Sequence, residues 1–359
     1  MKAAWDDWDE LPERKAALKS LLADIVQLWA SGGDPDAADE DAELRARLEG
    51  VLAWSKVARF LQAPFKTWAV TLYIAALFSA AIASVPSLQQ FLWLSSALGK
   101  TGKSTVVKLP SVVLGGDTPN SYCDVMNFET NFLGCGQGRQ GNAPEVAQCA
   151  GKRFIVVEEG KQKQSVVASN TGELNAELIK KLSGGCSSMK ATAKYQDPRT
   201  FTPSCLLVFL QNGTPPFPDG DEAFFSRMVH LRMPRHFTES TEEANEDELL
   251  INHRAADEAY IRTMVPEMLH WVAAFAPYLF QLSNARRLEP RPAKVREDTD
   301  DYMASPVDAG AEPAGRVFWA TMLRVYQVDE AEMPASRAQI QEPGRVFREL
   351  HNRITRITA

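Results

Sequence analysis

The chain has 359 residues, 45% of them hydrophobic and 24% charged, which is ordinary for a soluble globular protein and allows two or three domains. Its five cysteines are too widely spaced for a C-x-x-C metal site and too few for a disulfide scaffold, so a reducing, intracellular compartment is expected. The N-terminal residues are charged and lack an apolar core, so no cleavable signal peptide is expected.

The formal net charge of −7 argues at first against a nucleic-acid partner. Residues 1–50 contain 6 Lys/Arg and 13 Asp/Glu (6 − 13 = −7), so residues 51–359, with 33 of each, are neutral. Residues 151–210 contain nine basic and five acidic side chains (9 − 5 = +4). Because local charge sets the affinity for phosphates, this stretch is compatible with nucleic acid.

The first 62 residues predict helices. Apolar residues recur three or four positions apart from Leu18 to Trp29, and a second helix is expected over Glu43–Leu61, after the turn Ser31–Pro35. The apolar segment Thr67–Ser84 is expected to form a buried helix because it is rich in Ala and Ser. The overlapping apolar stretch Trp68–Pro86 is close to the length of a bilayer span, so a transmembrane helix is the alternative.

Four short apolar runs predict buried strands: Phe91–Leu94, Phe154–Val157, Leu206–Leu210 and Met228–Leu231. Near-continuous apolar character without alternation is typical of a parallel sheet that is covered on both faces. The predicted fold class is therefore α/β. The expected domains are a helical N-terminal region (1–88), an α/β core (89–240), a helical lid (241–285), a linker rich in Pro and charge (286–315) and a small helical C-terminal segment (316–359).

A phosphate-binding loop is predicted directly after the first strand. Glycines let successive N–H groups turn inward around an anion, and the helix that follows adds a positive dipole. A lysine and a hydroxyl residue then reach the phosphates and Mg²⁺. A polar turn is the alternative interpretation. The loop comprises Ala97, Leu98, Gly99, Lys100, Thr101, Gly102, Lys103, Ser104 and Thr105.

Three downstream features extend this prediction. The second predicted strand ends at Glu158 and Glu159; in a nucleotide hydrolase one carboxylate helps to bind Mg²⁺ and the other deprotonates the attacking water. Asn212 follows the third strand and is expected beside the γ-phosphate, although a turn is its simpler explanation. Arg227 precedes the fourth strand and is a candidate arginine finger, with a surface salt bridge as the alternative.

In this order, the motifs resemble superfamily-3 helicases of the primase-helicase type, which occur in poxviruses, giant viruses and phages. The resemblance runs from Trp93 to about Phe237, and more loosely to Trp271. Besides the loop and the residues just named, it rests on Pro144–Ala147, Gly151–Arg153, Leu174–Asn175, Ile179–Gly185, Tyr195–Pro198 and Phe201–Pro203.

The resemblance implies an ATP- and Mg²⁺-dependent motor with an AAA-like core. Lys103 and Ser104 match the phosphate and Mg²⁺ residues, and Glu159 matches the acidic residue of the second motif, with Glu158 beside it. Asn212 matches the sensor of the third motif. The family forms hexameric rings that unwind DNA in the 3′ to 5′ direction, with Arg227 as the finger that acts across the subunit interface.

The resemblance also implies single-stranded DNA as a partner. The block from Lys180 to Lys194 is similar to the family's DNA-gripping motif, so Lys180, Lys181, Lys190 and Lys194 are the candidate DNA-binding residues. A primase on another chain is a further implied partner, since the 88 residues before the core are too few for a primase domain. A replication role implies a location in the nucleus or cytoplasm, or at a viral replication site.

Several residues depart from the family pattern. Ala97 replaces a glycine, Cys186 stands where an Asp is common, Thr192 stands where an Arg is expected, and Pro110 is expected to shorten the first helix. The departures at Ala97, Cys186 and Thr192 motivate a second hypothesis, a nucleotide-binding ring scaffold without unwinding activity. A membrane-anchored NTPase is a third, which depends on Trp68–Pro86.

Overall fold

The computed structural model describes residues 12–85, 88–97, 99–116, 118, 121–128, 132, 144–158, 174–184, 188–192, 197–212, 221–239, 248–250, 253–282 and 287–304. The chain divides into two units, Met1–Ser305 and Pro306–Ala359. The predicted helical segment 316–359 lies in the second unit, outside the described residues.

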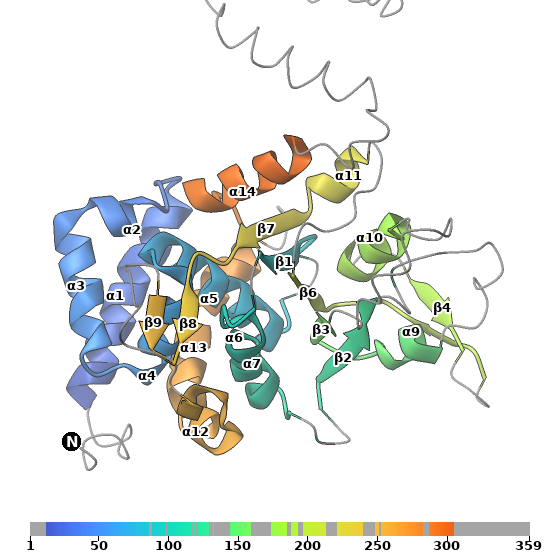
Figure 1. Cartoon of the computed structure of the whole chain (residues 1–359), viewed down its shortest axis with the longest axis horizontal. Coiled ribbons are helices and arrows are strands. Elements are labelled where there is room, and N and C mark those ends of the chain that lie inside the picture. Colours follow the sequence, from blue (N-terminus) through green and yellow to red (C-terminus); the bar gives the residue numbers. More distant parts are fainter. Residues whose placement is uncertain are drawn as a thin grey trace, which may run out of the picture. The chain divides into compact units, whose positions relative to one another are not determined.

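A five-stranded parallel sheet is the centre of the first unit (Figure 1), with the strand order β2-β3-β6-β1-β7. Its strands are β1 (Phe91–Ser96), β2 (Cys123–Asn127), β3 (Phe154–Glu158), β6 (Leu206–Asn212) and β7 (Met228–Arg232). The predicted α/β class is confirmed, and the four predicted strands are all present. The fifth, β2, escaped prediction because it is an edge strand whose side chains are mostly half-buried or exposed.

Each central strand buries side chains on both faces, which explains its near-continuous apolar sequence. Leu92 and Leu94 belong to one hydrophobic cluster, whereas Phe91 and Trp93 belong to the other. Successive strand residues point to opposite faces, so an alternating sequence would leave one face polar. Full burial of one such side chain contributes about 1.5–3 kcal/mol to the stability of the fold. Helices cover both faces of the sheet and provide this burial.

On the first face lie the N-terminal helices and the long helix near the end of the unit, and α9 and α10 lie on the other face (Figure 1). The first group consists of α1 (Pro12–Ala30), α2 (Ala37–Glu40), α3 (Ala42–Leu52), α4 (Lys56–Phe65), α5 (Trp68–Ile82), α6 (Lys103–Val106), α7 (Lys108–Val113), α12 (Glu258–Arg262) and α13 (Val265–Leu282). The second consists of α9 (Pro144–Gln148), α10 (Ala176–Gly184) and α11 (Glu222–Phe225).

The remaining elements are small. Helix α14 (Ala293–Ala304) packs against β7, and the short 3₁₀-helix η3 (His253–Ala256) precedes α12. Strands β4 (Met189–Ala191) and β5 (Arg199–Phe201) form an antiparallel pair, and β8 (His236–Thr238) pairs in parallel with β9 (Glu248–Leu250).

Helix α5 is the apolar segment for which a transmembrane helix was the alternative. All fifteen of its residues are buried, which fits the predicted core helix. Within the described residues, no single helix has both the length and the apolar character needed to cross a membrane. By those two criteria alone, α4 and α5 qualify as a pair, with a bend of 117° between them.

Three buried or half-buried carboxylates connect separate helices of the first unit. Asp39 accepts hydrogen bonds from the first two N–H groups of α5, at 2.8 and 2.9 Å. Glu267 of α13 accepts from the Ser55 hydroxyl and from the Lys56 N–H (3.0 Å) at the start of α4. Asp36 accepts from the first N–H of α14 at 2.7 Å. Each carboxylate satisfies N–H groups that have no partner within their helix and complements the helix dipole.

The predicted helix Glu43–Leu61 is in fact two helices, α3 and α4. Ser55 separates the two helices. Its side chain accepts a hydrogen bond from the Ala58 N–H at 2.8 Å and so caps the start of α4. Glu267 fixes this break from the outside, a long-range contact that the local pattern does not reveal.

The segment predicted as a linker, 286–315, contains helix α14, so the linker prediction is wrong for residues 293–304. Val295 and Tyr302 are buried, 0% and 1% exposed, and they are seven residues apart on one face of the helix. Charged residues occupy most of the other positions, which is why the composition indicated a linker.

Candidate functional site

The predicted phosphate loop lies at the C-terminal edge of the sheet, between β1 and α6. Gly102 has a left-handed backbone conformation with φ = 83°, which glycine adopts without steric cost. Its carbonyl accepts hydrogen bonds from the N–H groups of Thr105 (3.1 Å) and Val106 (2.9 Å) and so begins α6. Leu98 lies outside the described residues.

Lys103 is buried, with only 8% of its surface exposed. Its ammonium donates to Asn212 Oδ1 at 2.9 Å, to Thr101 Oγ1 at 3.2 Å and to the hydroxyl of Ser96. Asn212 is 109 residues away in the chain and ends β6, the strand beside β1. Because a buried ammonium is costly unless it is hydrogen-bonded or paired with an anion, this arrangement suits an anionic ligand.

Glu158 ends β3 at the same edge of the sheet and is exposed. In the strand register, Glu158 faces Leu210 and Ser96 faces Asn212. The ends of β3, β6 and β1 therefore carry Glu158, Asn212 and Ser96 along one edge, with neighbouring strands about 4.8 Å apart. Ser104, in the first turn of α6, is also exposed. Glu159, the other member of the predicted acidic pair, lies outside the described residues.

These residues have the right chemistry for Mg²⁺. Magnesium prefers hard oxygen ligands and usually keeps several waters, with one or two protein ligands and the substrate's phosphates. Ser104 and Glu158 offer a hydroxyl and a carboxylate at one exposed edge. They are the side chains that would bind the ion.

Pro110 does not shorten the first helix in the way that the sequence predicted. The helical segment breaks at Val107, between α6 and α7, and Pro110 is the third residue of α7, which continues to Val113. Proline is tolerated in the first turn of a helix because the N–H that it lacks would have no partner there. The break moves that first turn to Lys108.

Arg227 lies at the opposite edge of the sheet from Lys103. It immediately precedes β7, and its carbonyl accepts a hydrogen bond from the Phe91 N–H at the start of β1 (3.0 Å). One guanidinium nitrogen donates to the Lys180 carbonyl at 2.6 Å. The five residues of β7 span about 16 Å at about 3.3 Å per residue, so Arg227 does not belong to the Lys103 site of its own chain.

Two of the candidate DNA-binding lysines have acidic partners. Lys180 pairs with Asp221, and Lys181 pairs with Glu177 one helical turn away. Burial raises the pKa of Asp221, but the hydrogen bonds from Lys180 and from backbone N–H groups outweigh it and hold this pKa below its usual range.

The other two candidate lysines belong to the segment around β4 and β5. Lys190 is exposed on β4, and Lys194 lies outside the described residues. Arg199, which the sequence analysis did not select, is exposed on β5 opposite Ala191. Lys190 and Arg199 are therefore the described cations of this hairpin.

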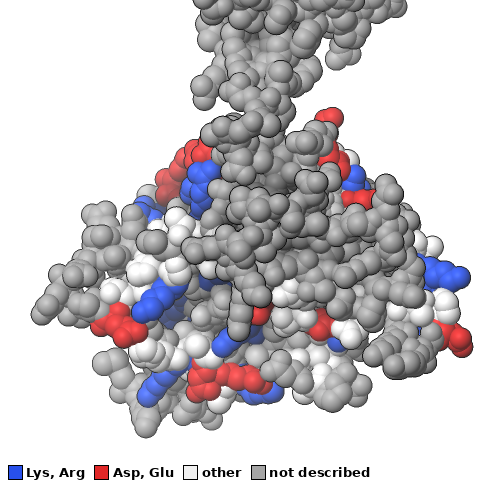
Figure 2. Space-filling model, turned by 45° about the vertical axis from the view of Figure 1, so that its right-hand side comes forward, with Lys and Arg blue, Asp and Glu red and all other residues white. Residues whose placement is uncertain are grey.

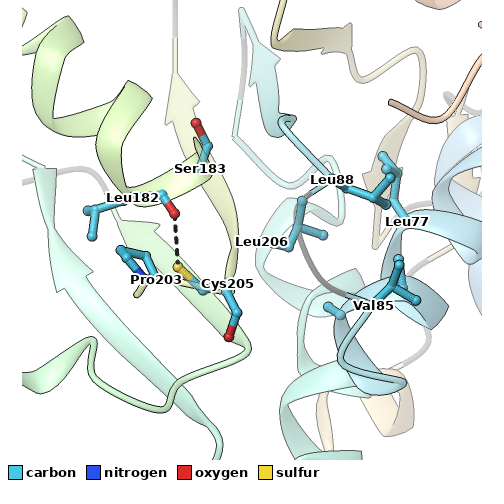
Figure 3. A pocket seen from close by; sticks show the side chains of 11 residues that line it. Leu77, Val85, Leu88, Leu182, Ser183, Pro203, Cys205 and Leu206 are labelled. Carbon is cyan, nitrogen blue, oxygen red and sulfur yellow. Dashed lines mark hydrogen bonds between the residues drawn. The ribbon is translucent and has the colours of Figure 1, made fainter. Parts of the chain in front are cut away.

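A small apolar cavity lies at the N-terminal edge of the sheet (Figure 3). Leu77 and Val85 line one side, and Leu182 and Cys205 line the other. About 20 Å³ is open to the centre of a water molecule, room for roughly one water. It is too small for a nucleotide and lies away from Lys103. Burial raises the pKa of the Cys205 thiol, which makes that thiol unreactive.

Ser96 is the site residue that sequence reasoning missed. It is the last residue of β1, 6% exposed, and its hydroxyl lies 3.5 Å from Asn212 Oδ1 while it also contacts the Lys103 ammonium. The available signal was a polar residue at the end of an otherwise apolar strand, just before the loop.

A family of unknown function (DUF5906) matches residues 94–227. That span begins in β1, ends at Arg227, and includes every predicted site residue. No curated protein matches the chain.

Solved structures give distant matches. The apo structure of the NrS-1 C-terminal region is 13% identical, with a TM-score of 0.41, and the match covers 68% of this chain and 51% of that one. The JCV helicase with a bound acetamide compound is also 13% identical, with a TM-score of 0.33, and covers 68% of this chain and 57% of that one. The chain therefore spans about half the length of the first structures that it matches.

Proposed function

We propose that this chain is an ATPase whose nucleotide site is the C-terminal edge of the sheet around Lys103. The observation that carries the proposal is the contact between Lys103 and Asn212, 2.9 Å apart in space and 109 residues apart in sequence. A buried lysine in a glycine-bearing loop after β1, facing a polar side chain at the tip of the neighbouring strand, is what triphosphate binding requires.

Each residue has a separate task in this proposal. Lys103 neutralises charge on the terminal phosphates, and the loop N–H groups surround them. Asn212 orients the γ-phosphate or the attacking water. Glu159 accepts the proton of that water, and Glu158 and Ser104 bind Mg²⁺, which neutralises phosphate charge when it is present.

We further propose that ATP hydrolysis drives movement along single-stranded DNA and unwinding of duplex during replication, in a ring of identical subunits. The β4–β5 hairpin supports the DNA part, because Lys190 and Arg199 are exposed on it and exposed cations follow the backbone of single strands. The position of Arg227 is compatible with a ring, because this residue is too far from its own Lys103 to act there.

A ring scaffold that binds nucleotide without unwinding is the second candidate. It is favoured by the ion pairs of Lys180 and Lys181, which neutralise two of the four proposed DNA contacts. On the face drawn in Figure 2, positive and negative side chains are interspersed among the described residues. Neighbouring acidic groups weaken the attraction of a cation for the phosphates of DNA.

The test measures ATP turnover with and without single-stranded DNA in wild type, Lys103→Ala and Lys108→Ala. Lys108 is an exposed lysine five residues away that donates to the Ala256 carbonyl at 3.0 Å, which makes it a matched control. We expect Lys103→Ala to lower turnover at least about 100-fold, because the charge on the terminal phosphates loses its counter-ion, and Lys108→Ala to retain it.

Three outcomes separate the candidates. Near-normal turnover in Lys103→Ala contradicts the nucleotide site. Turnover that DNA stimulates, together with strand separation, supports the motor. ATP binding in which DNA changes neither turnover nor affinity supports the scaffold.

A further inference from the structure

The chain that follows β7 runs along the outer side of the phosphate loop. The Met233 N–H donates to the Ser95 carbonyl at 2.8 Å, directly beyond the end of β7. Arg235 donates to the Ala63 carbonyl of α4 at 2.9 Å. These two bonds anchor the segment on the sheet and on α4, so the strand β8 that comes next lies at a fixed position beside the loop.

Phe237, the middle residue of β8, contacts the loop with both its backbone and its ring. Its N–H donates to the Lys100 carbonyl at 2.8 Å. A Cβ atom added to Gly102 would stand 3.0 Å from the Phe237 ring and 3.4 Å from Pro64. The loop is therefore packed between the aromatic ring of β8 and the end of α4, and the glycine is needed for this close approach as well as for its φ of 83°.

Lys100 shows why the loop needs this support. Its φ is 58°, a left-handed conformation that is strained for a residue with a side chain and persists only where neighbouring groups enforce it. The hydrogen bond from Phe237 acts on the carbonyl of this residue. The ion pair of Lys100 with Glu239 adds little, because its groups are 3.4 Å apart and more than half exposed.

We propose that Phe237 is a positioning residue that keeps the phosphate loop in its binding conformation before nucleotide arrives. The proposal rests on the proposed function for its consequence, since a loop that is already ordered binds a triphosphate without the entropic cost of ordering. The backbone N–H of Phe237, which every substitution keeps, bonds to the Lys100 carbonyl. The ring acts through Gly102 rather than by touching the phosphates, and the substitutions test this ring contact. Its removal should weaken binding more than it slows the chemical step.

The test compares Phe237→Ala with the conservative Phe237→Tyr, which keeps the ring, and with Phe225→Ala as the control. Phe225 is also a half-buried phenylalanine, but it stands two residues before Arg227, at the other edge of the sheet. Two readouts are used: the Kd and kcat for ATP, and, without nucleotide, hydrogen exchange of the hydrogen-bonded amides at the loop, those of residue 237, Thr105 and Val106. Phe237→Leu replaces the alanine variant if that variant lacks a cooperative thermal transition.

We expect Phe237→Ala to raise Kd about tenfold, equivalent to about 1.4 kcal/mol, with a smaller change in kcat and faster exchange of the loop amides. Phe237→Tyr should restore both readouts, and Phe225→Ala should leave Kd and loop exchange unchanged. Unchanged Kd and exchange in a folded Phe237→Ala protein overturn the proposal, as does an equal effect of Phe225→Ala.

The exchange readout separates this proposal from the proposed function. If wild type binds no ATP, the nucleotide site is disproved, yet loop exchange still reports whether Phe237 orders the loop. Faster exchange in Phe237→Ala then supports the positioning role alone, and unchanged exchange disproves it too.

Discussion

Lys103 and Asn212 are joined by a hydrogen bond that a bound triphosphate would compete for. The oxygens around the Lys103 ammonium belong to Ser96, Thr101 and Asn212, and phosphate oxygens would be stronger acceptors because they are charged. Asn212 therefore contacts the lysine and would also contact a bound phosphate, so a charge introduced at this side chain should change the affinity for phosphate.

Two substitutions of Asn212 test this position, one expected to lower kcat and the other to weaken ATP binding. Asn212→Ala should lower kcat about 100-fold, as the loss of one oriented polar group at a reacting centre typically does, with Kd for ATP changed only a few fold. Asn212→Asp should weaken ATP binding at least about tenfold, because a carboxylate 2.9 Å from the ammonium pairs with it and repels phosphate. Equilibrium binding and turnover assays measure both, and Asn212→Asp binding as tightly as wild type would contradict the arrangement.

At the scale of single residues, the sequence predicted those parts of the site that have motif spacing. Lys103 follows its glycine in a known pattern, and Asn212 follows a recognisable strand. Ser96 was not predicted, because no local signal indicates that this hydroxyl faces the lysine. Phe237 was not predicted either, since its contact with Gly102 depends on the path of the chain after β7.

At the scale of helices and strands, the junction of α4 and α13 depends on one buried carboxylate. Glu267 is 2% exposed and accepts hydrogen bonds from the Ser55 hydroxyl and from the N–H groups of Lys56 and Val57. Its removal leaves three donors buried without this acceptor. We expect Glu267→Ala to lower the free energy of unfolding by about 3 kcal/mol, measured by urea denaturation.

Glu258→Ala is the matched control for that experiment. Glu258 lies on α12 and pairs with Arg262, but both side chains are about half exposed, so we expect a loss of less than about 1 kcal/mol. Equal effects of the two substitutions would mean that Glu267 contributes no more than a surface residue.

The contribution of Glu267 to stability depends on pH because this carboxyl group is buried. Burial raises the pKa of Glu267, although the hydrogen bonds from Ser55, Val57 and Lys56 act in the opposite direction. The folded state therefore binds this proton more tightly than the unfolded state. Its contribution to stability is fully present below the unfolded pKa, near 4.5, and is lost as the pH rises through the folded pKa.

The comparison with Glu267→Gln isolates this effect, because glutamine does not titrate. The difference in unfolding free energy between wild type and Glu267→Gln should become less favourable to wild type from about pH 4 to pH 8. Urea denaturation at several pH values measures it. A difference that shifts toward wild type with rising pH would show that the fold prefers the ionised carboxylate.

The elements that the sequence predicted are those with a strong local pattern. The strands with continuous apolar residues, and α5, were recognisable because burial on all or most sides requires apolar residues at nearly every position. Helix α13 was recognisable because its buried residues recur three or four positions apart on one face. Helix α14 was missed because only two of the four buried residues described in it, Val295 and Tyr302, are apolar, whereas Asp298 and Thr299 are polar. The division between α3 and α4 was missed because Glu267, more than 200 residues away, stabilises it.

At the scale of the whole molecule, the strand order decides what the site residues can do. A parallel sheet was predicted, but local patterns do not specify the order β2-β3-β6-β1-β7, because it depends on which strands pair across long connections. This order places β1 beside both β6 and β7. Lys103 and Asn212 consequently meet at one edge, while Arg227 begins the strand on the other side of β1, at the opposite edge.

A mixing experiment tests whether Arg227 acts on a neighbouring subunit. Lys103→Ala and Arg227→Ala proteins should each lack turnover alone. In a ring, an intact Lys103 from one subunit can meet an intact Arg227 from the next, so an equal mixture should regain about a quarter of the active interfaces by random assembly around heterologous contacts. ATP turnover after subunit exchange measures this recovery.

The control replaces the Arg227→Ala protein by the double variant Lys103→Ala, Arg227→Ala, which supplies no intact lysine and should give no recovery. Recovery with the single variants but not with the double one is explained only by residues shared between subunits, because Lys103 and Arg227 lie at opposite edges of one sheet whose strand β7 spans about 16 Å. No recovery, in a mixture whose subunits demonstrably exchange, would assign Arg227 to the structural role that its bond to the Lys180 carbonyl already gives it.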